Sequence, residues 1–170
     1  MSRLRAIAAF AALSMALTPT SASSQQKPLK DQLIGTWHFV SWLGKTKNSV
    51  STNPVGGTDP KGVMVFDSAG GVYFILIADV PKLASSNRLK TTPEENQAIA
   101  HGTFAYFGSY TVNEAADKSF TIRVERSSYA NQVGTDNKRV ITALTEHELV
   151  YTTPATTSGG TNDWAWRRSK

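Results

Sequence analysis

Most of the chain alternates between apolar and polar positions with the two-residue period of a β-strand. In the segment from Ile34 to Leu43, the alternation divides the side chains between two faces. Trp37, Phe39, Ser41 and Leu43 fall on one face, and His38, Val40 and Trp42 on the other. Two further apolar runs, 62–67 and 71–77, flank Ser68-Ala69-Gly70 and predict a hairpin with a short turn. We expect the interior face of this hairpin to carry Met64, Phe66, Tyr73, Ile75 and Ile77.

A single helix interrupts the strand pattern. Thr92 is a suitable N-cap, Pro93 fits the first turn, and Glu94 and Glu95 favour the positive end of a helix dipole. This helix is expected to end at Gly102. Five more strand-like segments follow, at 104–112, 119–126, 139–144, 148–153 and 163–168. With about eight strands and short connections, the pattern predicts an all-β fold: a single eight-stranded antiparallel up-and-down barrel with one short helix.

Large aromatic residues stand at both ends of the strand region. Gly35-Thr36-Trp37 opens the first strand, and Trp164-Ala165-Trp166-Arg167-Arg168 closes the last one. Chain ends are usually polar and frayed unless they are held by the fold. The two clusters therefore predict that the first and last strands meet, as they do in a closed barrel.

The N-terminal region has the pattern of an export signal. A basic start is followed by the apolar run Ala6–Leu17 and by small residues up to Ala22. We divide the chain into a signal peptide (1–22), a linker and lead-in (23–33) and a barrel domain (34–170). The run is shorter than the ~20 apolar residues that span a bilayer, so we expect no stable membrane anchor. The predicted location is the periplasm or the exterior, and a chain without cysteine suits the periplasm.

Composition argues against several classes of function. The net charge of +5 includes Arg3 and Arg5 of the leader, and no long basic run remains for nucleic acid. The three histidines are scattered, with no metal-ligand spacing, and a chain without cysteine excludes thiolate sites. We expect no metal and no cofactor. The sequence leaves the oligomeric state open.

Several short motifs, taken in order, resemble the bacterial lipocalin-like domain family of the calycin superfamily. They are Leu33–Trp37 with Val40-Ser41-Trp42, Asp59–Gly62, Thr92–Glu95, Ala105–Tyr110, Val124-Glu125 with Asn131 and Gly134–Asp136, and Trp166–Arg168. The resemblance implies a barrel with an internal cavity, and a structural clasp at its closed end made by Gly35 and Trp37 under Arg167 or Arg168. The same family pattern has histidine, proline and an aromatic residue where this chain has Arg123, Ala130 and Gln132.

The inward faces of the barrel supply the candidate ligand-binding residues. They are Met64, Phe66, Tyr73, Ile75, Phe104, Tyr106, Tyr110 and Ile122. An apolar lining with a few hydroxyls suits a small hydrophobic molecule. The first hypothesis is therefore an exported, non-catalytic protein that binds such a molecule inside the barrel. The same side chains could instead fill the interior, since small barrels are often solid.

Two alternative functions remain open at this stage. A barrel isomerase or cyclase would act on an apolar substrate through an acid or base, for which Glu125, Tyr106 and Tyr110 are the candidates. Alternation places Glu125 outside with Arg123, and a bulge near Arg126 would be needed to bring it to the cavity. A solid-core structural or stress-related envelope protein would work through its long loops, 45–61 and 79–92.

Overall fold

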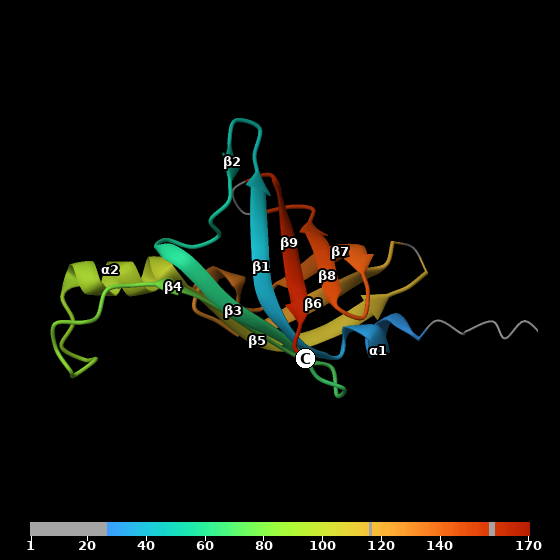
Figure 1. Cartoon of the computed structure of the whole chain (residues 1–170), viewed down its shortest axis with the longest axis horizontal. Coiled ribbons are helices and arrows are strands. Elements are labelled where there is room, and N and C mark those ends of the chain that lie inside the picture. The colour runs from blue at the N-terminus through green and yellow to red at the C-terminus, as the bar shows by residue number, and fades with distance from the viewer. Residues whose placement is uncertain (1–26, 116, 157–158) are drawn as a thin grey trace, which may run out of the picture.

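The computed structural model describes residues 27–170 except 116 and 157–158 (Figure 1). The expected signal peptide, residues 1–22, lies outside this range. Nine strands and three helical segments make up the described chain. They are α1 (Leu29–Leu33), β1 (Gly35–Lys45), β2 (Val50–Ser51), β3 (Thr58–Phe66), β4 (Gly71–Asp79), α2 (Pro93–Gly102), β5 (Thr103–Asn113), β6 (Ser119–Ser127), the 3-10 helix η1 (Ala130–Gln132), β7 (Asp136–Leu144), β8 (Glu148–Thr153) and β9 (Thr161–Arg168).

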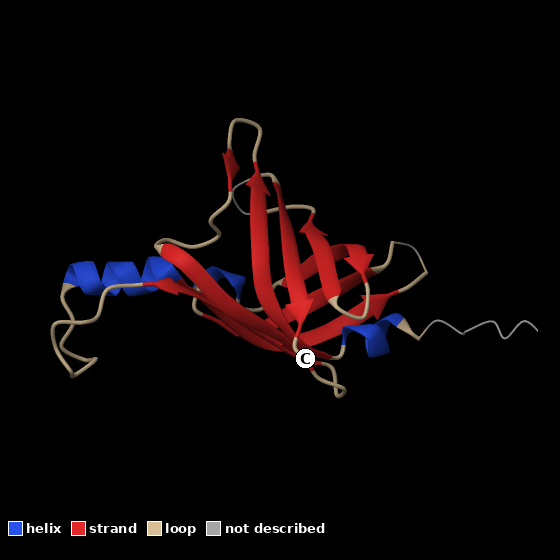
Figure 2. Ribbon diagram, in the orientation of Figure 1, coloured by secondary structure: helices blue, strands red, loops and turns tan. Residues whose placement is uncertain are grey.

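Eight of the strands form a closed antiparallel barrel, as predicted. The sheet order is β2-β1-β3-β4-β5-β6-β7-β8-β9, and β1 also pairs with β9 to close the ring (Figure 2). The short strand β2 pairs only with the end of β1, at Gly44 and Lys45. Closure leaves the eight barrel strands without a free edge, which protects their backbone groups from pairing with other chains.

The up-and-down order divides the connections between the two ends of the barrel. The β3–β4, β5–β6 and β7–β8 turns lie at one end, with α1 and the C-terminus beside them (Figure 1). We call this the closed end, because α1 buries Leu29 and Leu33 there. The longer segments 46–57, 80–102, 128–135 and 154–160 lie at the opposite, open end. They include α2 and η1.

The inner face of β4 differs from the prediction. Val72, Phe74 and Leu76 are buried, whereas Tyr73, Ile75 and Ile77 are 48%, 45% and 44% exposed on the outer face. Every position in this run is apolar, so alternation alone does not distinguish the two faces. The hairpin does: Asp67 and Gly71 pair around the turn, with Asp67 N–H donating to Gly71 O at 2.9 Å.

This pairing fixes the register of the hairpin. It sets Phe66 opposite Val72 and Met64 opposite Phe74. Residues directly opposite one another share a face of the sheet. Because Met64 and Phe66 face inward as predicted, Val72 and Phe74 must do so too.

A bulge in β1 overturns a second prediction. The pairing of β1 with β9 shifts between Phe39 and Ser41, and Val40 becomes the extra residue. Beyond the bulge the faces exchange, so Trp42 turns to the side of Trp37 and Phe39. Its ring then packs edge-on against Trp164, with centroids 6.1 Å apart. The expectation that Trp42 lies opposite Trp37 was wrong, because strict alternation does not survive an inserted residue.

Helix α2 forms as the sequence predicted. Thr92 is the N-cap and accepts a hydrogen bond from Glu95 N–H, and the Glu95 carboxylate accepts one from Thr92 N–H. These two bonds form a capping box, which satisfies otherwise unpaired backbone donors at the helix start. The helix ends at Gly102, directly before β5. None of the helices in the described part of the chain is long and apolar enough to cross a membrane.

Aromatic side chains occupy much of the barrel interior. The Phe74 ring stacks on Tyr106 at 4.6 Å and meets Trp164 and Trp166 edge-on, each at 5.6 Å. Toward the closed end, Phe66 contacts both Tyr110 and Phe120. Edge and offset contacts of this kind are favourable for aromatic rings. The centre of the barrel is therefore a packed core, and space for a ligand has to be sought nearer the open end.

Candidate functional site

The closed end holds the predicted clasp, and the structure selects its arginine. The guanidinium carbon of Arg168 lies 4.0 Å from the centroid of the Trp37 ring. Its nitrogens donate to three backbone carbonyls, of Gln32 at 2.5 Å, Ile34 at 2.6 Å and Glu146 at 2.7 Å. The neighbouring Arg167 is exposed. Arg168 therefore ties the start of β1 to the β7–β8 turn, and this end of the barrel is structural.

Gly35 is part of the same arrangement. Its φ of +128° lies in a region that side chains rarely adopt, and a Cβ there would stand 2.7 Å from Nη1 of Arg168. Glycine thus allows the guanidinium to approach the Ile34 carbonyl. The Trp37 indole N–H donates to Leu33 O at 2.8 Å, which also holds α1 in place. These contacts explain why glycine and tryptophan open the first strand.

A pocket of about 300 Å³ lies at the open end. Its lining comes from β1, β5, β7, β8, β9 and the loops above them, and Phe104 and Trp164 supply its main aromatic surfaces. Trp42 joins them because of the bulge in β1. We call this the mouth pocket. It is small, and it is bounded below by the stacked rings of the barrel centre.

Unpaired polar atoms gather around the mouth pocket. Five buried side-chain polar atoms have no hydrogen-bond partner in the described structure, and four belong to residues that line it. The four are Trp42 Nε1, Gln132 Oε1, Arg139 Nε and Thr153 Oγ1. Buried polar groups are normally paired, because leaving one unpaired costs about 1–3 kcal/mol. Such a cluster is a reason to look for a ligand there.

Arg139 is the most unusual of these residues. It is only 7% exposed, and its cross-strand partner is Phe120, a core residue. Nη1 donates to Lys138 O at 2.9 Å, and none of the ion pairs found among the described residues involves Arg139. The hydrophobic pattern does not predict this buried position. An η1-containing connection precedes β7, so no short turn fixes its register against β6.

Two tyrosines lie within the electrostatic reach of Arg139. Burial raises the pKa of Tyr106, and the positive charge and hydrogen bonding of Arg139 oppose that rise. Burial also raises the pKa of Tyr151, with Arg139 again acting in the opposite direction. The Tyr151 hydroxyl donates to Met64 Sδ at 3.9 Å. Both phenols stay neutral, so neither supplies a counter-charge to the guanidinium.

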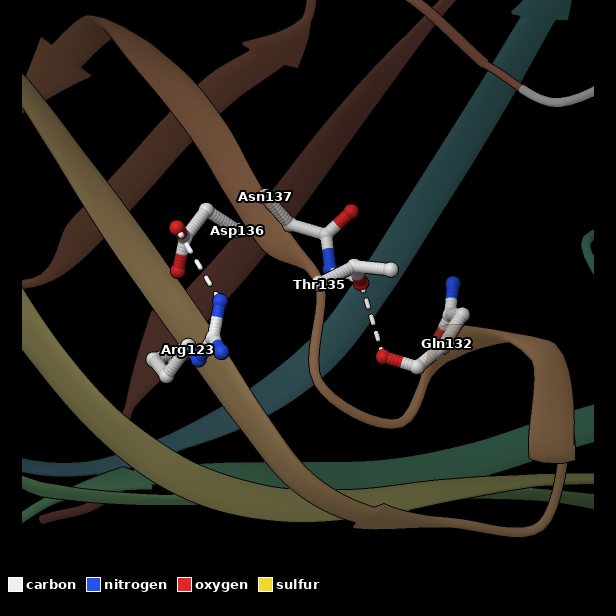
Figure 3. Close-up of polar contacts among 5 residues, drawn as sticks. All are labelled: Arg123, Gln132, Thr135, Asp136 and Asn137. Carbon is white, nitrogen blue, oxygen red and sulfur yellow. Dashed lines mark hydrogen bonds and ion pairs between the residues drawn. The ribbon is translucent and has the colours of Figure 1, made fainter.

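Near η1, an ion pair lies on the outside of the barrel, and the residues beside it line the mouth pocket (Figure 3). Arg123 and Asp136 are paired at 3.2 Å and are both exposed. The Thr135 hydroxyl donates to Gln132 O at 2.7 Å, and Asn137 Nδ2 donates to Thr135 Oγ1 at 3.0 Å. Gln132 and Asn137 line the mouth pocket. The hydrogen bonds of Thr135 thus hold this edge of the pocket.

The predicted ligand-binding residues occupy five different surroundings. Phe104 lines the mouth pocket, and Tyr106 is buried below it. Met64, Phe66 and Ile122 face inward but lie in the packed core. Tyr110 faces the closed end, where its hydroxyl donates to Asp67 O at 3.1 Å. Tyr73 and Ile75, expected inside, lie on the outer face instead.

Glu125 lies outside the barrel. A bulge does occur here, because Phe107 pairs with Arg126 and Gly108 with Val124, which makes Glu125 the extra residue. The side chain nevertheless remains exposed. Arg123, which was expected on the same outer face, forms an ion pair with Asp136.

A second groove lies on the outer face of the barrel. It measures about 340 Å³ and is lined by Tyr73, Ile75 and Phe107 together with residues of β6. The most exposed apolar residue on the long loops is Leu89, which stands apart from this groove in the sequence. Across the described ranges, no three His, Cys, Asp or Glu side chains are grouped to hold a metal ion.

The closed eight-stranded ring, the clasp and the pocket at the open end define a small barrel of calycin type. A sequence profile of the lipocalin-like domain matches residues 34–168, and the chain belongs to this family. The fold is one that supports ligand binding in a barrel. A comparison with curated proteins finds no match.

Solved structures similar to this chain are both natural and designed. A lipocalin-like protein from Bacteroides uniformis is 12% identical, with a TM-score of 0.43, and the match covers 81% of this chain and 99% of that one. A redesigned β-barrel is 11% identical (TM-score 0.45, 86% and 100% covered). A de novo designed fluorescence-activating β-barrel is 12% identical (TM-score 0.41, 82% and 96% covered).

Proposed function

We propose that this protein is exported and binds a small, largely apolar molecule in the mouth pocket, without catalysing a reaction. The observation that carries the proposal is the mouth pocket itself, with aromatic surfaces from Phe104 and Trp164 and unpaired polar atoms around them. Ligand sites commonly combine an apolar lining with a few polar groups that fix orientation. The membership of the lipocalin-like domain family supports the same reading.

The location of the pocket limits the size of the ligand. Packed rings fill the barrel below Phe104 and Trp164, so a long chain cannot extend along the axis. A compact molecule of up to three rings fits about 300 Å³. Export is supported by the basic start, apolar run and small residues that end at Ala22.

Catalysis by Glu125 or Tyr110, two of the three candidates named above, has little support. Glu125 is exposed outside the barrel, and the Tyr110 hydroxyl is engaged with Asp67 O at the closed end. A general acid or base has to reach the proton it transfers within hydrogen-bond distance. We therefore favour binding over the isomerase or cyclase alternative.

Titration with the neutral fluorescent probe N-phenyl-1-naphthylamine tests the proposal. We expect saturable binding, with energy transfer from tryptophan to the probe. The variant Ala155→Trp places a large ring at the exposed pocket rim and should weaken binding by about tenfold. The matched control Ile75→Ser alters the outer groove and should leave the affinity unchanged.

Two results would contradict this proposal. One is the absence of saturable binding of any apolar probe to the folded protein. The other is a loss of binding in Ile75→Ser but not in Ala155→Trp, which would move the site to the outer groove. Cell fractionation with an antibody to the protein tests export separately: a protein retained in the cytoplasm with residues 1–22 intact would refute it.

A further inference from the structure

We infer that the ligand of the mouth pocket carries an anionic group, which binds against Arg139. The inference rests on the proposed function and specifies the chemical class of the ligand: a compact apolar body with a carboxylate, sulfonate or phosphate. Its basis is a buried guanidinium that lines the mouth pocket and has no carboxylate partner among the described residues.

The charge of Arg139 is not compensated within the described part of the chain. A buried arginine is normally paired, because an isolated charge away from water is expensive. The acids found in ion pairs are engaged elsewhere: Asp163 with Lys45, Asp136 with Arg123, and Asp117 with Lys138. The phenols of Tyr106 and Tyr151 near Arg139 are neutral. The pocket therefore holds a positive charge that an incoming anion would balance.

Of the four unpaired atoms around this charge, two can only donate and one, Gln132 Oε1, can only accept. Arg139 Nε and Trp42 Nε1 are donors only, and both lack a partner. The Thr153 hydroxyl can donate as well, and its oxygen is unpaired. An anion with two or three oxygens accepts from several donors at once, and guanidinium pairs with such groups in two parallel bonds. A neutral alcohol or amide would leave most of these donors unsatisfied.

The remainder of the lining fits an aromatic or compact aliphatic body. Phe104 and Trp164 lie beside the polar cluster, and the Trp164 ring is held by edge contacts with Phe39 and Trp42. A ligand ring can therefore contact these two residues while its anionic group reaches Arg139. Both parts of the site face the open end, where solvent and ligand can enter.

A matched pair of probes separates the anionic group from the apolar body. The first, 1-anilinonaphthalene-8-sulfonate, carries a sulfonate on the ring system that N-phenyl-1-naphthylamine presents without charge. We expect Arg139→Met to weaken binding of the sulfonate by about tenfold or more. Binding of the neutral probe should stay within about twofold, because Met keeps the length and apolar stem of the side chain.

Further variants control for misfolding and for binding of the probes in the outer groove. Trp42→Phe keeps an aromatic ring but removes one unpaired donor. It should weaken binding of the sulfonate by a few-fold and leave binding of the neutral probe unchanged. Ile75→Ser should leave both probes unchanged. Circular dichroism of each variant verifies the barrel before titration, and 1-naphthoate should displace the sulfonate at a lower concentration than 1-naphthalenemethanol does.

The outcomes of this experiment distinguish the two proposals. If the neutral probe binds wild-type protein and the sulfonate does not, or if Arg139→Met leaves the ratio of the two affinities unchanged, the anionic inference fails and the proposed function stands. If neither probe binds, the proposed function fails and the inference falls with it. If Arg139→Met loses binding of the sulfonate but keeps binding of the neutral probe, the result supports both the proposed function and the anionic inference.

Discussion

Replacing Arg168 with alanine should destabilise the barrel far more than replacing its neighbour Arg167. Arg168 donates to the carbonyls of Gln32, Ile34 and Glu146 and covers the Trp37 ring. The bonds to Ile34 and Gln32 join segments that lie 134 and 136 positions apart in the sequence. Arg167 is exposed, and its substitution should change the free energy of unfolding by less than about 0.5 kcal/mol.

The magnitude follows from the contacts of the guanidinium. A hydrogen bond from a charged group contributes about 1.5–3 kcal/mol, and a cation over a ring about 0.5–1 kcal/mol at an accessible site. Arg168 is partly exposed, so water replaces some of the lost bonds, and bonds to one group do not add fully. We expect Arg168→Ala to cost about 3 kcal/mol. Arg168→Lys should cost about 2 kcal/mol, because an ammonium group cannot reach three separate carbonyls in one plane.

Chemical denaturation followed by far-ultraviolet circular dichroism measures these differences. Tryptophan fluorescence is less suitable, because the substitution changes the surroundings of Trp37 directly. A double-mutant cycle with Trp37→Leu isolates the contribution of the ring contact, for which we expect about 0.5–1 kcal/mol. If Arg168→Ala and Arg167→Ala differ by less than about 1 kcal/mol, the clasp does not hold the closed end and our account of it is wrong.

Three other predictions concern separate parts of the barrel. Gly108→Ala should cost about 3 kcal/mol in denaturation experiments, because its Cβ would lie 1.9 Å from the backbone oxygen of Arg123; a stable variant would show that the β5–β6 contact is looser. Thr92→Ala removes the capping box of α2 and should cost about 1 kcal/mol, while an unchanged hydrogen-exchange rate at the helix start would argue against it. Burial raises the pKa of Tyr151 above its unfolded value of about 10, so the stability it contributes below that pH is lost as pH rises further. Denaturation midpoints between pH 8 and pH 11 should therefore fall less steeply for Tyr151→Phe than for the wild type.

The fold was largely predictable because its main signals are local. Thr92 and Pro93 mark the start of a helix by their own chemistry, and strand periods survive in most segments. The two corrections come from non-local or irregular features. The bulge at Val40 exchanges the inner and outer positions of β1 beyond it, and no residue type in this segment predicts a bulge. The inner face of β4 follows from the hairpin register, and that register is set by the pairing of Asp67 with Gly71.

The candidate site was much less predictable than the fold. Phe104 was expected inside and does line the pocket, but Arg139, Gln132 and Thr153 were not among the expected residues. Their position depends on the register of β7 and β8 against the rest of the sheet. A charged residue in a strand suggests the solvent face, and only tertiary packing places the Arg139 guanidinium in the interior. The polar residues of a largely apolar pocket are therefore the ones that a hydrophobic pattern overlooks.

The pairing of β1 with β9 also has a consequence for the order of folding. The strand that closes the ring, β9, is synthesised after the other eight, and its contacts span nearly the whole barrel domain. Loops of this length close late, and folds that depend on them fold slowly. A nascent chain lacking residues 161–168 can form hairpins but not the barrel. The barrel therefore cannot close until β9 has been synthesised, and the earlier strands remain in a partly folded state until then.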